Sequence, residues 1–218
     1  MSASSFFTPD ELGRIEQAVR RAESGVSGEI VPVFVARSGP YEQGNLRAGI
    51  TFAALFILAW LTLYEFGGTW GGHWFYTPGA LVTLTVLVFS TAFFAAVSVP
   101  RFRCLFITGK ELDETVDVAA RMAFLKQEVF RTRQRTGMLI FISLLEHRVE
   151  VLGDTGISGK VSPGEWDGIV KTIVDGLKNG RSADGICEAV DAARQLLLKN
   201  GFTAAPDDTN ELPDNLRL

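Results

Sequence analysis

Hydrophobic residues are distributed unevenly along the chain, and the longest apolar stretch lies near its middle. Residues 48–64 carry no charged side chain, and after Glu65 none appears until Arg101. This stretch contains two apolar blocks, residues 49–63 and 80–99. A helix needs about 20 apolar residues, or about 17 at the shortest, to cross a bilayer. Both blocks reach this length once their apolar neighbours are included.

The pattern predicts a transmembrane helical hairpin with helices at 47–66 and 80–100 and a short loop at 67–79. The limits of the apolar spans are Ala48 and Tyr64, then Ala80 and Val99. The alternative is a pair of buried core helices in a soluble protein. It is disfavoured because helices of this length without charges have no polar face to present to water.

The flanking charges predict the orientation of this hairpin. The loop between the two helices has no Lys or Arg, whereas cations lie on both flanks: Arg37, Arg47, Arg101, Arg103 and Lys110. Positively charged flanks remain on the cytoplasmic side of a membrane. We therefore expect an integral protein of a bacterial-type inner membrane with both termini in the cytoplasm.

The rest of the chain alternates between helical and extended patterns. Apolar residues recur every three or four positions after four capping residues, which predicts helices that begin at Thr8, Thr108, Ser162 and Ser182. The second of these helices is expected to continue to about Arg133. Runs of β-branched and apolar residues predict strands at 29–36, 138–144 and 148–153. Residues 102–107 fit either a short strand or an interfacial segment.

These elements together predict an α/β fold. A strand, a helix and a second strand in one sheet form a parallel pair with a right-handed crossover. Helices then cover both faces, which gives a three-layer α/β/α sandwich on a small mixed sheet, interrupted by the two-helix transmembrane hairpin. The two parts of this domain are residues 1–37 and 104–201, and the polar residues 202–218 are expected to form a disordered tail.

Composition excludes several classes of function. The chain has 218 residues and a net charge of −4, so there is no basic face for nucleic acid. Its two cysteines, Cys104 and Cys187, are far apart and do not match the spacing of a zinc site, which favours free thiols. Residues 1–29 are polar and amphipathic and do not have the pattern of a signal peptide.

One end of the predicted sheet gathers the candidate chemistry. Glu29 begins the first strand, Thr136 precedes the second and Asp154 follows the third. If the strands pair as predicted, these residues meet at one edge, facing away from the bilayer. Oxygen ligands from Glu29 and Asp154 would then suit a divalent cation such as Mg²⁺ or Ca²⁺. The alternative is that the two carboxylates cap backbone amides or pair with Arg or Lys.

A phosphatase site would need more than these two carboxylates. It requires a nucleophile or a metal-bound water together with cations for the phosphate. Asp154 is the candidate nucleophile, but His147 is expected in a hairpin turn and His73 in the membrane loop. An enzymatic role is therefore disfavoured, and no catalytic residue is assigned.

Three stretches in this order resemble the TPM domain family, which is named partly for thylakoid proteins of photosystem repair. They are Ser27-Gly28-Glu29-Ile30, residues 136–151 and the segment 153–166, which begins Gly-Asp-Thr-Gly-Ile and ends at Trp166. The resemblance extends over nearly all of the soluble part. It implies an α/β/α sandwich, and it implies accessory roles in the assembly or maintenance of membrane complexes. For some members it also implies acid phosphatase activity or divalent-metal binding.

The chain departs from the common layout of that family. Typical members carry a signal peptide and often a C-terminal anchor, whereas here the predicted anchor interrupts the domain. We therefore expect a cytoplasmic interaction module for another membrane protein or complex. The alternative is a divalent-metal-dependent phosphatase that acts through the Glu29/Asp154 end of the sheet.

Overall fold

The computed structural model describes residues 6–66, 76–204 and 211–218. The chain folds into two compact units. Residues 1–39 and 113–218 form an α/β unit, and residues 40–112 form a helical unit between them in sequence. The predicted loop at 67–79 lies mostly outside the described residues.

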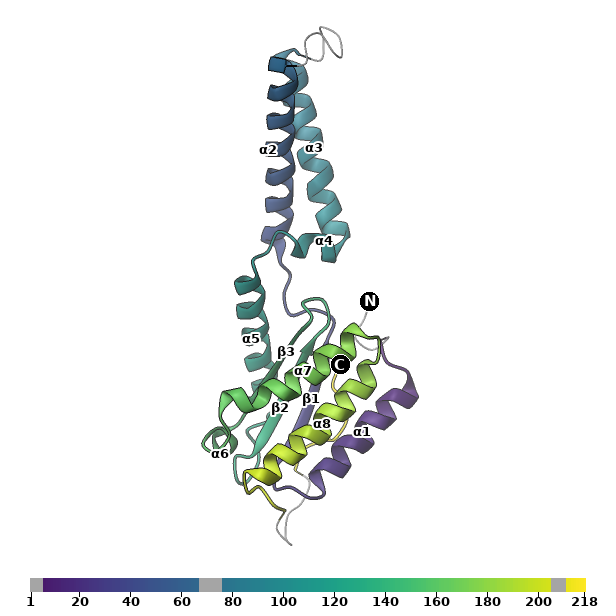
Figure 1. Ribbon diagram of the computed structural model, residues 1–218, viewed down its shortest axis with the longest axis vertical. Coiled ribbons are helices and arrows are strands. Elements are labelled where there is room, and N and C mark those ends of the chain that lie inside the picture. The colour runs from purple at the N-terminus through teal and green to yellow at the C-terminus, as the bar shows by residue number, and fades with distance from the viewer. Residues whose placement is uncertain (1–5, 67–75, 205–210) are drawn as a thin grey trace. The chain divides into compact units, whose positions relative to one another are not determined.

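The α/β unit is built on a three-stranded mixed sheet with the order β1-β2-β3 (Figure 1). β1 (Glu29–Val35) runs parallel to β2 (Gly137–Ser143), and β3 (Arg148–Gly153) runs antiparallel to β2. β2 is buried along its whole length because it is the central strand. The fold class predicted from the sequence is confirmed.

Three helices pack side by side on one face of this sheet (Figure 1). They are α1 (Pro9–Glu23), α7 (Asp167–Lys178) and α8 (Ser182–Lys199). Their apolar stripes enclose the larger core with alternate residues of the strands, such as Ile30 and Ile140. A capping box formed by Thr8 and Glu11 begins α1, as its sequence predicts.

A single helix of the described chain, α5 (Gly109–Lys126), covers the other face. Val116 and Ala120 from α5 form a smaller core with the opposite set of strand residues, including Val31 and Leu139. This arrangement gives the predicted layers of helix, sheet and helix.

The end of α5 differs from the sequence prediction, which extended this helix to about Arg133. The helix ends at Lys126, because Glu128 adopts a left-handed backbone conformation with φ of 53°. The cations at 131–135 therefore lie in the loop before β2. After β3, Asp154 caps a one-turn helix, α6 (Thr155–Ser158).

Residues 211–218 are not a disordered tail, in contrast to the sequence prediction. They run beside β1, where Phe34 N donates to Arg217 O at 2.8 Å and Arg217 N donates to Pro32 O at 3.1 Å. The side chains of Asp214 and Leu216 are buried. The prediction of disorder was based on the polar composition of this segment, and it did not identify the few residues that hold the segment to the sheet.

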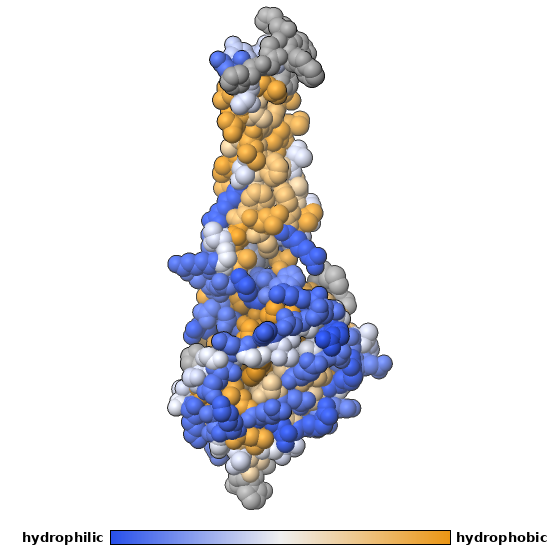
Figure 2. All heavy atoms as spheres, viewed as in Figure 1, coloured by the Kyte–Doolittle hydropathy of each residue, from blue (hydrophilic) through white to orange (hydrophobic). Residues whose placement is uncertain are grey.

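The helical unit is a hairpin of α2 (Glu42–Phe66) and α3 (Pro78–Ser98), followed by the short helix α4 (Pro100–Cys104). Apolar side chains cover the surface of α2 and α3 (Figure 2). Both helices are long and apolar enough to cross a membrane. The 102–107 segment is thus partly helical, rather than a strand.

Close packing and paired charges define this hairpin. A Cβ atom on Gly49 would lie 2.7 Å from the ring of Phe89, so glycine lets α2 and α3 approach closely. Near the loop end, the rings of Trp60 and Tyr64 stack at 5.6 Å. At the other end, Arg47 binds Glu111 through two hydrogen bonds of 2.7 Å.

Candidate functional site

The strand register brings the predicted site residues to one edge of the sheet. Glu29 lies opposite Gly137, and its backbone N–H donates to Thr136 O at 3.2 Å. On the other side, Asp154 N donates to Gly137 O at 2.8 Å. Glu29, Thr136 and Asp154 therefore meet around the first residue of β2.

Asp154 is buried and has two structural partners. Its Oδ1 accepts a hydrogen bond of 2.7 Å from Thr155 N, which caps α6. Its Oδ2 lies 2.9 Å from Arg135 Nε and forms an ion pair. Asp154 also lines a pocket of about 340 Å³ between the C-terminal half of α5, the end of β3 and α6.

Glu29 is also buried, and its partners lie in the C-terminal segment. Its Oε1 accepts a hydrogen bond of 3.0 Å from Glu211 N, and among the described residues none forms a hydrogen bond with its buried Oε2. Burial raises the pKa of this carboxyl group, although the backbone amides of Glu211 and Leu212 oppose the increase. Glu29 therefore holds residues 211–218 against the sheet.

The chain between α5 and β2 passes over Gly137, the first residue of β2. A Cβ atom on Gly137 would lie only 2.0 Å from Val129 O, so this position requires glycine. Val129 itself is fully buried. Glu29 and Asp154 thus share a sheet edge, but each has its own set of partners.

Two further acidic residues beside Glu29 were not predicted from the sequence. Glu23, at the end of α1, accepts a hydrogen bond of 2.8 Å from Ile30 N. Burial raises the pKa of Glu23 to about 9, and the negative charges of Glu29 and Asp214 contribute to this increase. Arg20 Nε lies 3.0 Å from Asp214 Oδ2 and partly balances the cluster.

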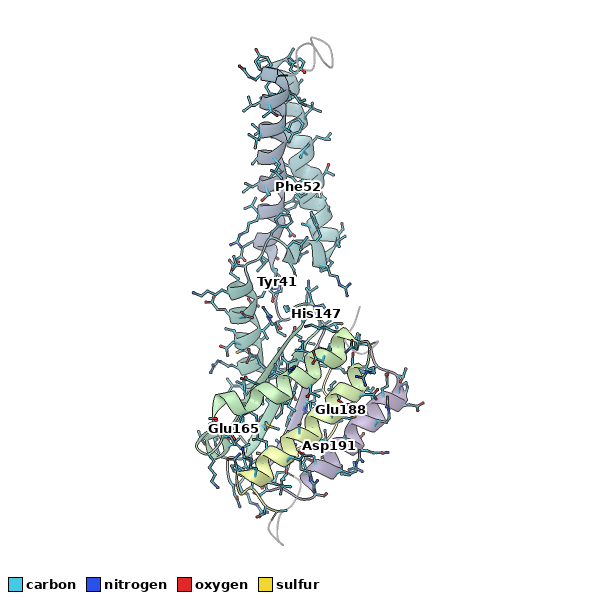
Figure 3. The ribbon with its side chains drawn as sticks, viewed as in Figure 1. Tyr41, Phe52, His147, Glu165, Glu188 and Asp191 are labelled. Carbon is cyan, nitrogen blue, oxygen red and sulfur yellow. The ribbon has the colours of Figure 1, made fainter. Side chains whose placement is uncertain are left out.

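The opposite end of the sheet carries a hydrogen-bond network that the sequence analysis also missed. Ser38 Oγ donates to Ser143 Oγ at 2.7 Å, and Ser143 Oγ donates to the carboxylate of Glu146. Glu146 also accepts a hydrogen bond of 2.8 Å from Ser38 N. The network ties the end of β1 to the β2–β3 turn, where His147 has a positive φ of 52° (Figure 3).

The remaining candidate groups have ordinary roles. Burial raises the pKa of the Cys187 thiol, which is the opposite of an activated thiolate. Within the described residues, no three His, Cys, Asp or Glu side chains are grouped as metal ligands would be. Arg135 pairs with Asp154 in this structure. Metal binding by Glu29 and Asp154 stays a prediction.

The fold and this acidic sheet end define a small mixed α/β/α domain whose two sequence parts flank an apolar hairpin. Residues 97–196 match the family model described as the TPM domain. The chain therefore carries a TPM domain. The matched range lacks α1 and β1, which the structure nevertheless places in the same sheet and core.

A solved structure supports this fold. The chain is similar to the BA42 protein from the psychrophilic bacterium Bizionia argentinensis, whose structure was determined by NMR. The TM-score is 0.58 at 19% sequence identity, and the alignment covers 97% of this chain and 94% of that one. At this identity the similarity concerns the fold alone. No curated protein matches the sequence.

Proposed function

We propose that this protein is a membrane-anchored interaction module. The hairpin of α2 and α3 would insert into a bacterial-type inner membrane, and the TPM domain would bind another membrane protein or complex in the cytoplasm. The main support is the hairpin itself, because large apolar side chains such as Leu58 and Leu87 are 60% exposed there. Apolar faces of this size are stable in lipid and costly in water.

Membrane insertion is tested by washing membranes with alkaline carbonate, which removes peripheral proteins. We expect the protein to remain in the pellet. Orientation is tested after both native cysteines are replaced by serine. An impermeant thiol reagent added to intact cells should label Gly71→Cys and not Ala204→Cys. Release by carbonate would contradict the anchor, and the reverse labelling would contradict the orientation.

The partner role is tested by affinity purification of the full chain from solubilised membranes, followed by mass spectrometry. A membrane protein that is recovered at a constant ratio after crosslinking would support the proposal. Recovery of only abundant soluble proteins would contradict it. The control is a variant with the same hairpin and an unrelated soluble domain.

The alternative function is a divalent-metal-dependent phosphatase. One observation favours it, which is the position of Asp154 on the wall of the 340 Å³ pocket beside Arg121 and Thr155. Turnover of a phosphate monoester that EDTA abolishes, and that Asp154→Asn removes, would support this activity. The matched control is Asp191→Asn on the exposed side of α8 (Figure 3). Equal turnover in both variants would exclude Asp154 as the catalytic group.

A further inference from the structure

β3 forms an outer edge of the sheet, and part of its backbone is open. Asp154 N bonds to β2, so residues of β3 with even numbers also face β2 through their backbone groups. The N–H and C=O groups of Val149, Val151 and Gly153 therefore point outward. Ser158 Oγ satisfies Gly153 O at 2.7 Å. Among the described residues, none forms a hydrogen bond with the outer groups of Val151, which is partly exposed.

This edge lacks two of the features that prevent the addition of another strand, which are a proline and a bulge. Its charged residues are Arg148, which pairs with Asp113, and Glu150. β3 has the sequence RVEVLG and pairs without interruption with β2 from Arg148 to Gly153. Its backbone is therefore available to an incoming strand near Val151.

An apolar pocket lies directly beside this edge. Phe124, Leu125 and Leu152 form its apolar wall, and Asp154 and Thr155 lie at its end. An apolar stripe on the outer side of α5 continues from it, where Val118, Met122 and Leu125 are 60%, 63% and 59% exposed. Such a contiguous apolar surface outside the core is typical of a binding site.

The charges beside the pocket favour a cationic group. Glu150 lies on the same face of β3 as Leu152, two residues away. Burial raises the pKa of Glu150, and the nearby carboxylates of Asp117 and Asp113 add to this increase. Arg121 and Arg148 pair with these two aspartates at 2.9 and 2.7 Å. The three carboxylates of Glu150, Asp113 and Asp117 thus lie beside two cationic side chains, those of Arg121 and Arg148.

We propose that the outer edge of β3 binds an extended segment of the partner protein as a fourth strand. An apolar side chain of that segment occupies the pocket opposite Leu152, and a Lys or Arg two residues away lies opposite Glu150. Main-chain hydrogen bonds to Val151 supply the attachment, and the two side chains supply the specificity. This inference rests on the proposed interaction function and assigns its surface.

An extended segment fits this surface better than a second copy of the chain. An antiparallel pair of β3 strands centred on Glu150 would place Glu150 opposite its own copy, and like charges in that position are destabilising. A pair centred on Val151 would place Glu150 opposite Leu152. A pair centred on Val149 would place Arg148 opposite Glu150, but it would place Glu146 opposite Leu152. None of these registers supplies both the cation opposite Glu150 and an apolar side chain for the pocket.

The first experiment uses a synthetic peptide of threonines with a lysine and a leucine two positions apart. Its binding to the full chain in detergent micelles is measured by fluorescence anisotropy. We expect the affinity to fall by about tenfold or more when glutamate replaces the lysine, which corresponds to 1.4 kcal/mol. Two further peptides carry N-methyl groups on every second residue, one at the odd positions and the other at the even positions. Only one of these two sets of amides faces β3, so one peptide should lose binding and the other should retain it.

Protein variants locate the site. Leu125→Ser should weaken binding of the peptide by about tenfold, as expected for a lost pocket contact of 1.4 kcal/mol. Leu218→Ser is the control, because Leu218 is similarly exposed but lies in the segment beside β1. Glu150→Gln should remove the preference for lysine over glutamate. Equal binding by all variants, no binding by any peptide, or peptide-independent dimerisation would overturn the proposal.

A photoreactive amino acid separates this inference from the proposed function. Placed in cells at position 125, it should crosslink the same membrane protein that purification recovers, and at position 191 it should not. Crosslinking to that protein only at 191 would overturn the β3 surface and leave the interaction function intact. Failure to recover any membrane partner, with specific peptide binding retained, would overturn the proposed function alone.

Discussion

The carboxyl group of Glu23 links protonation to the folding of the α/β unit. Burial is the main cause of its pKa of about 9, against an ordinary value of 4.5. A group with a raised pKa holds its proton more tightly in the folded state than in the unfolded state. The free energy of unfolding therefore decreases as pH rises from about 4.5 to about 9, and it changes little from this group outside that range.

We expect Glu23→Gln to remove this dependence on pH and to stabilise the protein at pH 8. The amide can still accept the hydrogen bond from Ile30 N, and it carries no charge beside Glu29 and Asp214. A single group contributes a slope of up to about 1.4 kcal/mol per pH unit. Denaturant unfolding between pH 5 and pH 9 measures the slope, with Glu188→Gln at an exposed position of α8 as control. An unchanged slope in Glu23→Gln would show that Glu23 titrates normally.

Gly137 tests the close passage of the chain over the first residue of β2. In Gly137→Ala, the new methyl group would meet Val129 O at 2.0 Å, so either the strand end or the covering loop must move. Overpacking of this kind costs about 1–3 kcal/mol. The matched control is Gly168→Ala in α7, where no atom lies within 4 Å of the new Cβ and where alanine favours the helix. Thermal unfolding of both variants should show a loss only for Gly137→Ala.

Local sequence patterns predicted the helices and strands of the core. They did not predict the features that depend on contacts between distant segments. The strand Arg148–Gly153 was predicted with its observed limits, because its alternating pattern and glycine end are local signals. The end of α5 was placed too late, because cations at 131–135 resemble a helix C-terminus. The observed end depends on the left-handed turn at Glu128, which no composition rule specifies.

The candidate site was also predictable only in part from the sequence. The positions of Glu29 and Asp154 at one sheet edge followed from strand order and direction alone. Their partners did not follow, because Glu211 and Asp214 are almost 200 residues from Glu23 and Glu29 in a segment whose composition is typical of disorder. Pairing of that segment with β1 depends on tertiary contacts.

Arg103 has a second role that its place in the flanking charges did not reveal. Its buried guanidinium donates to Ala96 O at 3.2 Å and Val97 O at 3.1 Å in the last turn of α3, and to Pro40 O. Carbonyls at a helix end have no partner within the helix, so this side chain satisfies them in place of water.

We therefore expect Arg103→Leu to destabilise the hairpin, by about 1.5–3 kcal/mol for each charged hydrogen bond that is not replaced. Arg103→Lys should restore part of this loss, because a lysine reaches fewer carbonyls. Arg101→Leu, at an exposed site two residues away, is the control for the change in charge. Unfolding of the full chain in mixed micelles, monitored by circular dichroism, measures the difference. Equal effects at positions 101 and 103 would contradict the capping role.

The α/β unit is assembled from two sequence segments that the hairpin separates. α1 and β1 precede the hairpin, yet Ile15 and Val19 lie in the core with α8, and β1 pairs with β2 along its whole length. Burying such a side chain contributes about 1.5–3 kcal/mol, whereas the cost of closing a loop grows only logarithmically with its length. The free energy gained by packing α1 and β1 into the core is thus larger than the entropic cost of closing the loop that contains the hairpin.

The final prediction follows from this balance. Replacing residues 41–106 by a Gly/Ser linker should give a soluble protein that unfolds in one transition, because residues 1–37 contribute a strand and a helix to the common core. Ile15→Asp in this shortened protein should then unfold the entire domain and make residues 1–37 and the segment after 107 sensitive to protease together. Gln17→Asp, at an exposed position of the same helix, is the control and should retain the transition. If the shortened protein is soluble while residues 1–37 alone are cleaved, the two segments do not form one cooperative unit. The meeting of Glu29 with Asp154 at one sheet edge would then fail as well, since it depends on the pairing of β1 with β2.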